Sequence, residues 1–349
     1  LERRYGQSGR YADQANLITR ALSHLQQKQE QQPESDELRE QRRALLLRLG
    51  DVQRDFLAAP AQATATYELV TREWPQDHAA LAALAGLYAQ QERGDDLRRT
   101  LARLLETTHE PVERSKLLFQ LGELTEKQGD QSEAYKLIGQ AFYLDPANRL
   151  AFTAYERLCY RREQWQEALR MYEAALRLIE TQKSRSYRPA DLHLRRGQVQ
   201  LQYLQQLDDA VISYTRALES DAENDTTQAT LERIYASRNQ WKELLSAYER
   251  RAQLVRDDGK RVEILRRGAR VATAKLRDVA EAVRFFEKLH AVDPTDSEAL
   301  DSLEVHYDRI RDYEKLIGLL STRVALSLDE QQIIALNMRI GLLCEEGLR

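Results

Sequence analysis

The residues best suited to bind a partner form a basic and aromatic edge in the middle of the chain. Arg157, Tyr160 and Arg161 are spaced so that they share one face of a predicted helix. That face is rotated away from an apolar stripe that includes Phe152 and Cys159. An arginine fork binds a carboxylate through two parallel hydrogen bonds, so the edge predicts an acidic or carboxylate-bearing peptide as ligand. The favoured alternative is a solvated arginine face, because arginine is the main basic residue throughout the chain.

No pattern in the sequence is typical of catalysis. The chain lacks a Gly-x-x-x-x-Gly-Lys-Ser/Thr phosphate loop, a Gly-x-Ser-x-Gly elbow and a His-Glu-x-x-His pair. Its six histidines are far apart, and its two cysteines, Cys159 and Cys344, do not have the spacing of a zinc site or a disulfide framework. We therefore expect a chain that is not an enzyme and that takes no small-molecule substrate, cofactor or metal.

The charge balance argues against a polyanionic partner. The chain has 52 basic and 56 acidic residues, a formal net charge of −4, so no overall field attracts nucleic acid or an anionic membrane. No apolar run approaches the roughly 18 residues that span a bilayer. We expect a soluble chain, with the cytoplasm favoured and the periplasm as the alternative.

Helices must position these residues, because helix breakers are scarce. The 349 residues include only 14 glycines and 7 prolines, while 42% are hydrophobic and 31% charged. This composition predicts an ordered, mainly helical chain. Internal copies of one helix support the prediction, and they cover residues 1–5, 155–159, 231–235 and 303–307.

A second kind of copy alternates with the first and carries a recognisable pattern. Its clearest example runs from Leu121-Gly122 through Gly129, Ala134, Ile138 and Ala141 to Pro146. Leu-Gly, Gly, Ala, aromatic or Ile, Ala and Pro at these offsets resemble the tetratricopeptide repeat. The resemblance implies an all-α, right-handed α-solenoid of about nine helix-turn-helix repeats, with first helices lining a concave surface.

The spacing of the repeats predicts that they come in pairs. A marker residue on each second helix recurs at alternating steps, one constant at about 34 residues and the other longer and variable. The pair of units is therefore the larger repeat of the sequence. The markers are Gln14, Ala63, Leu97, Ala134, Ala168, Ala210, Leu244, Ala282 and Leu316.

We predict one solenoid over residues 1–349, cut from a longer protein at both ends. Its units are approximately 1–28, 34–75, 78–108, 112–146, 149–182, 190–222, 225–256, 260–294, 297–328 and a partial 331–349.

Two further expectations concern positions within the repeats. We expect Gly122 to face Ala134 where the two helices of a hairpin approach most closely. The resemblance places Phe119 and Glu123 at inner positions of a first helix, so they join Arg157, Tyr160 and Arg161 as candidate partner-binding residues. These inner positions lack the Lys and Asn set with which some family members grip chaperone tails, so we do not expect that ligand.

The leading functional hypothesis is a non-catalytic scaffold that binds a peptide or helix of another protein in its concave groove. One alternative is a regulatory or sensory module of a larger enzyme or signalling protein. The other is an RNA-binding helical repeat, against which stands the net charge of −4. Apolar helix faces at the two ends also predict self-association. The Arg-rich composition loosely resembles paired-repeat proteins of GC-rich bacteria.

Overall fold

The structure is a computed structural model, and it describes residues 9–31 and 36–347. Every element in these ranges is a helix, and no strand occurs in them. The helix copy at residues 1–5 lies outside the described residues. The chain divides into two compact units, Leu1–Glu167 and Ala168–Arg349, and the division falls within one helix, α10.

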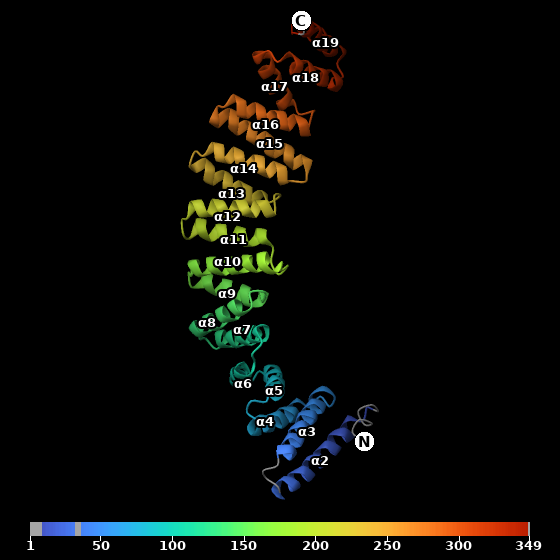
Figure 1. The fold of residues 1–349 in the computed structure, drawn as a ribbon, viewed down its shortest axis with the longest axis vertical. Coiled ribbons are helices and arrows are strands. Elements are labelled where there is room, and N and C mark those ends of the chain that lie inside the picture. Colours follow the sequence, from blue (N-terminus) through green and yellow to red (C-terminus); the bar gives the residue numbers. More distant parts are fainter. Residues whose placement is uncertain (1–8, 32–35, 348–349) are drawn as a thin grey trace. The chain divides into compact units, whose positions relative to one another are not determined.

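Paired helices joined by short turns make up the first unit (Figure 1). Each helix packs on its neighbours along the chain, so the core is a row of small apolar layers rather than one central cluster. The helices are α2 (Tyr11–Gln31), α3 (Asp36–Asp55), α4 (Pro60–Glu73), α5 (His78–Gln90), α6 (Gly94–Thr107), α7 (Pro111–Lys127), α8 (Gln131–Leu144), α9 (Arg149–Arg161) and the start of α10 (Trp165–Gln182).

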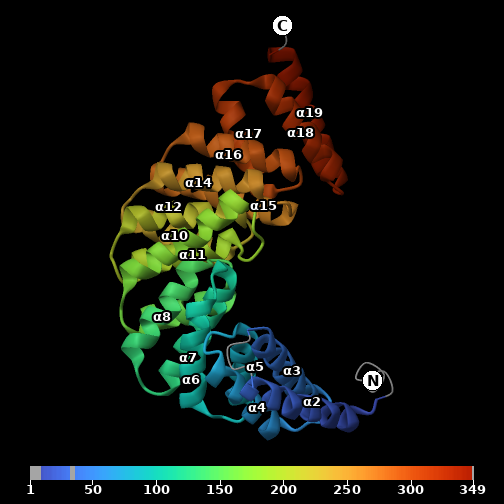
Figure 2. The same cartoon turned by 60° about the horizontal axis from the view of Figure 1, so that its bottom comes forward.

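The second unit continues the same pattern of stacked hairpins, which can be followed in Figures 1 and 2. Beyond the rest of α10, its helices are α11 (Pro189–Gln202), α12 (Leu207–Ser220), α13 (Asp225–Ser237), α14 (Trp241–Leu254), α15 (Asp258–Val271), a π-helical turn η1 (Ala272–Leu276), α16 (Val279–Val292), α17 (Ser297–Ile310), α18 (Tyr313–Leu326) and α19 (Glu330–Gly347). The prediction of an all-α helical-repeat fold is confirmed in both units. That one solenoid runs through both, with the unit limits given above, stays a prediction.

A residue in the left-handed backbone region marks the turn that precedes each second helix. Each of these residues lies five positions before one of the sequence markers, and all the markers are matched in this way. The turn therefore has the same place in every repeat, although the connections between repeats vary in length. The residues are Gly9, Ala58, Glu92, Gly129, Glu163, Gln205, Asn239, Arg277 and Arg311.

Close helix contact explains a glycine in the first helix of alternate hairpins. A Cβ atom at Gly122 of α7 would lie 2.5 Å from Cγ1 of Ile138 on α8, which is too close for two carbon atoms. The residue nearest to this position is therefore Ile138, which lies one helical turn after the predicted Ala134. The Ile138 side chain occupies the space that a side chain at position 122 would take.

Some first helices begin at a residue that also ties them to the preceding repeat. Asp77 caps α5, where its Oδ1 accepts a hydrogen bond from the backbone N–H of Ala80 at 2.8 Å. Its Oδ2 accepts a hydrogen bond from Nε of Arg43 on α3 at 2.5 Å. Asp296 at the start of α17 repeats this arrangement with Arg266 of α15. One carboxylate thus both starts a helix and fixes its neighbour.

Candidate functional site

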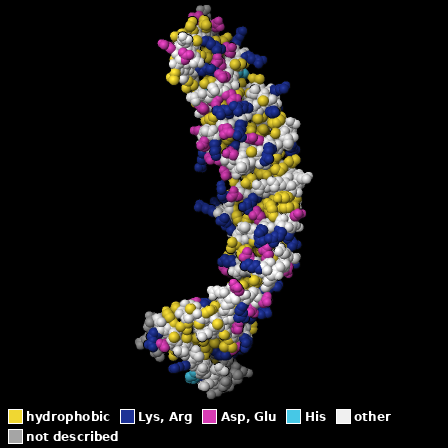
Figure 3. Space-filling view, turned by 180° about the vertical axis from the view of Figure 1, so that it is seen from behind, with side chains coloured by type: hydrophobic (Ala, Val, Ile, Leu, Met, Phe, Trp, Pro, Cys, Tyr) yellow, Lys and Arg dark blue, Asp and Glu magenta, His cyan; other side chains and the backbone are white. Residues whose placement is uncertain are grey.

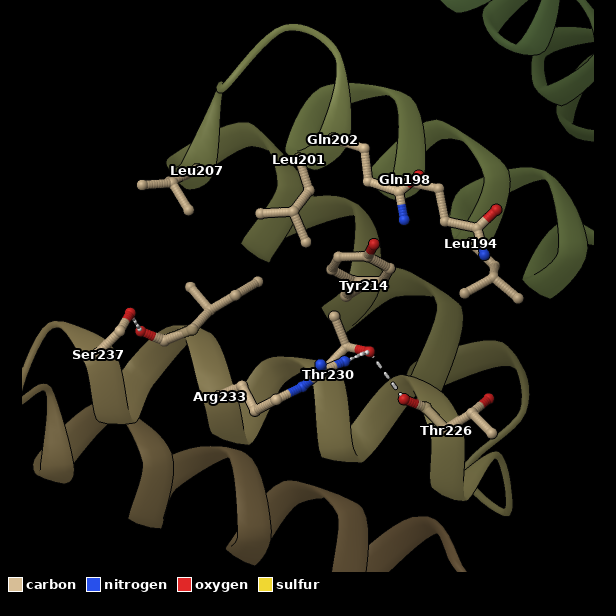
Figure 4. A pocket seen from close by; sticks show the side chains of 11 residues that line it. Leu194, Gln198, Leu201, Gln202, Leu207, Tyr214, Thr226, Thr230, Arg233 and Ser237 are labelled. Carbon is tan, nitrogen blue, oxygen red and sulfur yellow. Dashed lines mark hydrogen bonds between the residues drawn. The ribbon is translucent and has the colours of Figure 1, made fainter.

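A groove crosses the second unit where two first helices lie on either side of a second helix (Figure 4). This α11–α13 groove has a volume of about 380 Å³. On α11 and on α13 its residues recur every three or four positions, with one adjacent pair on each helix, so each set lies on one helix face. The lining residues are Leu194, Gln198, Leu201 and Gln202 of α11, Leu207 and Tyr214 of α12, and Thr226, Thr230, Arg233, Ile234 and Ser237 of α13.

The floor of the α11–α13 groove is apolar and its rims are polar but mostly uncharged. Figure 4 shows Tyr214 between the two rims. Burial raises the pKa of Tyr214 to about 12, and the positive charge of Arg233 opposes this rise, so the phenol stays protonated at neutral pH. Gln198 and Gln202 on one rim and Thr230 on the other supply hydrogen-bond donors and acceptors. Such an arrangement suits a polypeptide backbone above apolar side chains.

Arg233 is the one charged side chain among the residues that line this groove. It is exposed, and its Nη2 donates to Oγ1 of Thr230 at 3.3 Å. Thr230 in turn donates to the backbone carbonyl of Thr226 at 2.9 Å, and Ser237 donates to that of Ile234 at 2.8 Å. The hydroxyl protons on this rim are therefore held by the helix itself, which leaves lone pairs of the hydroxyl oxygens for a ligand.

A second groove occupies the equivalent place in the next pair of repeats. This groove is called α15–α17 by analogy with the first, although its lining residues come from η1, the turn after it, α16 and α17, and it has a volume of about 350 Å³. Its Val279, Phe286, Ser302, Val305 and Arg309 follow Leu207, Tyr214, Thr230, Arg233 and Ser237 of the first groove at one constant offset in the sequence. Arg277, Asp278, Ala282, Val283, His306 and, from η1, Thr273 complete the lining. The two grooves are thus two copies of one site with different side chains.

The predicted edge of Arg157 and Arg161 lies at the same place in the first unit, since these residues precede Arg233 and Ser237 at one common offset. Here the arginines of α9 bind Glu126 of α7. Arg157 donates from both terminal nitrogens to the two carboxylate oxygens, each at 2.6 Å. Arg161 donates to Glu126 Oε1 and to Gln131 Oε1, each at 3.0 Å. The hydrogen bond from Arg157 holds the pKa of Glu126 below its usual range, although partial burial opposes the shift.

The other predicted residues lie around this cluster. Half-buried Tyr160 packs edge-on against Trp165, with ring centroids 5.2 Å apart. Glu123 is exposed, and its negative charge helps to raise the pKa of Arg157. Glu123 also lines a groove of about 590 Å³ between α5 and α7, whereas half-buried Phe119 does not. The structure thus brings Arg157, Arg161 and Glu123 together, and a role in partner binding stays a prediction for all five residues.

Sequence reasoning missed the residues of the two grooves. Glutamine, threonine and serine are common on the exposed faces of helices, so Gln198, Gln202 and Thr230 do not by themselves indicate a binding site. Arg309 is one of many arginines. Comparison of successive repeat pairs at their common offset, rather than a search for single motifs, is the signal that finds them.

Metal ligands and thiols in the described residues are few, and of the two free cysteines Cys159 is buried and Cys344 exposed. The described residues contain no group of three or more His, Cys, Asp and Glu side chains that could hold a metal ion. Burial raises the pKa of the Cys159 thiol to about 12, which keeps it protonated and unreactive at neutral pH. None of the helices in the described ranges is long and apolar enough to cross a membrane. Acidic and basic side chains are interspersed on the face drawn in Figure 3.

The fold and its grooves define a helical-repeat protein. The tetratricopeptide repeat family model matches residues 151–186 and 229–262, so the chain carries tetratricopeptide repeats in these two segments. Comparison with curated proteins gave no match. Repeats of this family are in general protein-interaction scaffolds, and most have no catalytic role.

Solved structures with a similar course of the chain share little sequence with it. A tetratricopeptide repeat protein with an unusual peptide-binding site, YrrB, is 14% identical over 60% of this chain and 97% of its own, with a TM-score of 0.35. A tetratricopeptide repeat protein from Parabacteroides merdae is 14% identical over 76% of this chain and 96% of its own, with a TM-score of 0.33. A chain in the structure of Naa15/Naa10 bound to HypK-THB is 14% identical, and the match covers 87% of this chain and 46% of that one, with a TM-score of 0.41.

Proposed function

We propose that the chain is a non-catalytic scaffold that binds an extended segment of another protein in the α11–α13 groove. The observation that supports this function is the combination of an apolar floor, which includes Tyr214, with amide side chains on the α11 rim and hydroxyl side chains on the α13 rim. An extended segment presents backbone N–H and C=O groups that these side chains can pair. The α15–α17 groove, at the equivalent place in the next pair of repeats, provides a second contact with an apolar floor and charged side chains in its lining.

The composition of the rims favours a peptide over a nucleic acid. Only Arg233 among the lining residues is basic, and nucleic-acid sites depend on several cations that neutralise phosphates. No acidic residue lines the groove either, so a neutral segment meets no unfavourable charge. The arrangement also lacks a nucleophile paired with a base, which is the minimum for most hydrolytic chemistry.

A random peptide library displayed on phage tests the proposal directly. The whole chain is the bait, and selected peptides are synthesised and titrated by fluorescence polarisation. Thr230→Trp fills the groove and is expected to weaken binding at least tenfold. Ile212→Trp is the matched control, because Ile212 is 52% exposed on α12 and does not line the groove. The function is refuted if no peptide is selected, or if both variants bind selected peptides as well as the parent chain does.

A further inference from the structure

Two exposed arginines line the α15–α17 groove without an acidic partner. Arg309 lies on α17 and Arg277 lies in the turn between η1 and α16. Among the described residues no ion pair is found for either arginine. Asp278 is the one carboxylate that lines the groove, where it also caps α16, and Asp308 lies 3.5 Å from Arg339. The lining thus carries two arginine charges against one carboxylate, so the groove presents a net positive charge.

The equivalent place in the first unit shows what such an arginine binds. Arg161 matches Arg309 in the repeat, and together with Arg157 it holds the Glu126 carboxylate. Glu126 lies four residues after Gly122, the glycine at the close helix contact. Four residues after the corresponding glycine of α15, Gly268, the chain has Ala272. The second unit therefore keeps the arginine and replaces the internal carboxylate with a buried methyl group.

The rest of the α15–α17 groove suits an aliphatic group beside the carboxylate. Phe286 is buried, whereas Val279 and Val305 are 54% and 70% exposed, so an apolar surface lies next to the arginines. A ligand methyl group placed there removes this apolar surface from water, which favours binding. A phosphodiester chain gains nothing from such a floor, and a free inorganic anion cannot use it.

The turn that carries Arg277 differs from the other turns of its kind. In α15 the helix widens into the π-helical η1, and Arg277 follows in the left-handed region, with its φ at 55°. Arg277 comes nine positions after Gly268, whereas in the first unit the left-handed Gly129 comes seven positions after Gly122. The additional residues bring an arginine to the rim of the groove, where Gly129 stands in the first unit. π-Helical turns are rare and often occur at functional sites.

We propose that the α15–α17 groove binds an aspartate or glutamate side chain of the partner, with a neighbouring aliphatic side chain on Val279, Phe286 and Val305. This inference rests on the proposed scaffold function and adds the chemistry of the ligand. Arg309 and Arg277 bind the carboxylate, as Arg157 and Arg161 bind Glu126. The ligand is an internal acidic side chain rather than a chain terminus, because Glu126 itself is the side chain of a residue within a helix.

Peptides from the same library, synthesised with an amidated C-terminus, test this inference. We expect selected sequences to contain an acidic residue next to an aliphatic one. Replacement of that acid by its amide, Glu by Gln or Asp by Asn, is expected to weaken binding about tenfold, because it removes charge-assisted hydrogen bonds. The double variant Arg277→Gln/Arg309→Gln should bind the acid and amide forms equally. Arg311→Gln is the matched control, since Arg311 is exposed nearby and does not line the groove.

The possible outcomes distinguish a failure of this inference from a failure of the proposed scaffold function. Peptides that bind in a Thr230-dependent way, with no preference between acid and amide, overturn the inference and leave the scaffold function standing. An acid preference that survives in the double variant also overturns it. If no peptide binds, both proposals fail. Binding of labelled oligo-uridine that is lost in the double variant, without any acidic peptide, overturns it in favour of a nucleic-acid ligand.

Discussion

At the scale of single residues, the tightest constraint on this fold is the space between the helices of a hairpin. Gly122 has no room for a side chain, because the Ile138 side chain and its backbone nitrogen both lie within 3.3 Å of a Cβ atom placed there. Gly86 of α5 is also a helical glycine, yet a Cβ atom placed on it meets no atom within 4 Å. Gly122 is therefore required by the lack of space, whereas Gly86 only lowers the stability of its helix.

Substitution of these glycines by alanine is expected to have opposite effects. Gly122→Ala should lower the free energy of unfolding by about 1–3 kcal/mol, because the hairpin must open or Ile138 must leave its rotamer. Gly86→Ala should raise it by about 0.5–1 kcal/mol, because alanine restricts the unfolded chain and favours helix. Urea unfolding followed by circular dichroism measures both. Equal destabilisation in the two variants contradicts the steric explanation.

Glu126 makes a second residue-scale prediction, which depends on pH. Its side chain is 14% exposed, whereas Arg157 and Arg161 are 45% and 47% exposed. Glu126→Gln should therefore lower the free energy of unfolding by only about 1 kcal/mol at pH 7. Arg157 lowers the pKa of Glu126 in the folded chain. The carboxylate therefore stabilises the fold above the unfolded-state pKa of about 4.3, and this stabilisation is lost as pH falls through the folded-state pKa.

Unfolding of both chains from pH 7 down to pH 3 checks this dependence. The difference between the parent chain and Glu126→Gln should shrink as the pH falls below about 4. Glu133→Gln is the control, since the Glu133 to Lys136 pair is a surface contact of 3.4 Å with little expected effect. A difference that stays constant across this range would mean that Glu126 acts by shape and not by charge.

The spacing of Arg157 and Arg161 could be recognised in the sequence, but their partner could not. Glu126 is 31 residues before Arg157 and lies on a different helix, so the contact depends on how α7 and α9 stack. The same limit applies to Gly122, whose facing residue is decided by the offset between two antiparallel helices. Periodicity gives the face of a helix on which a residue lies, and only the packed structure gives its neighbour across that face.

At the scale of helices, the repeat could be predicted well because its signals are local. Apolar spacing, the turn and the capping residue all lie within a single repeat, and each can be read without knowledge of distant parts. The π-helical turn after α15 could not be predicted, because nothing in the sequence 272–276 forbids an α-helix. Its cause is geometric, since two more residues than in α7 must fit between the glycine contact and the turn.

The start of α5 carries the prediction that belongs to this scale. Asp77→Ala removes both the helix cap and the ion pair with Arg43, and should lower the free energy of unfolding by about 2 kcal/mol. Asp77→Asn keeps the cap and should cost about half as much. Asp130→Ala removes only a cap, that of α8, and provides the control. Thermal unfolding ranks the three, and an Asp77→Ala effect no larger than that of Asp130→Ala refutes the double role.

At the scale of the whole molecule, stability is expected to vary along each unit because every helix packs mainly on its neighbours in sequence. In the first unit, α9 buries Ala151, Phe152, Ala154, Tyr155, Leu158 and Cys159, whereas Ile18 is the buried residue of α2 in the described part of the chain. In the second unit, α16 buries Ala282, Phe285, Phe286 and Leu289, whereas α19 buries Leu343 among its described residues.

Hydrogen exchange of the backbone amides, measured by mass spectrometry, tests this picture within each unit separately. Amides of α2 should exchange about a hundredfold faster than those of α9, and α19 should show the same difference from α16, because opening a helix with few buried side chains costs about 2–3 kcal/mol less. Exposed Ile334, Met338 and Leu342 of α19 show how little of that helix is covered. Exchange at one common rate within a unit would mean that the unit opens as a single cooperative block, and that the contacts between neighbouring helices do not set its stability.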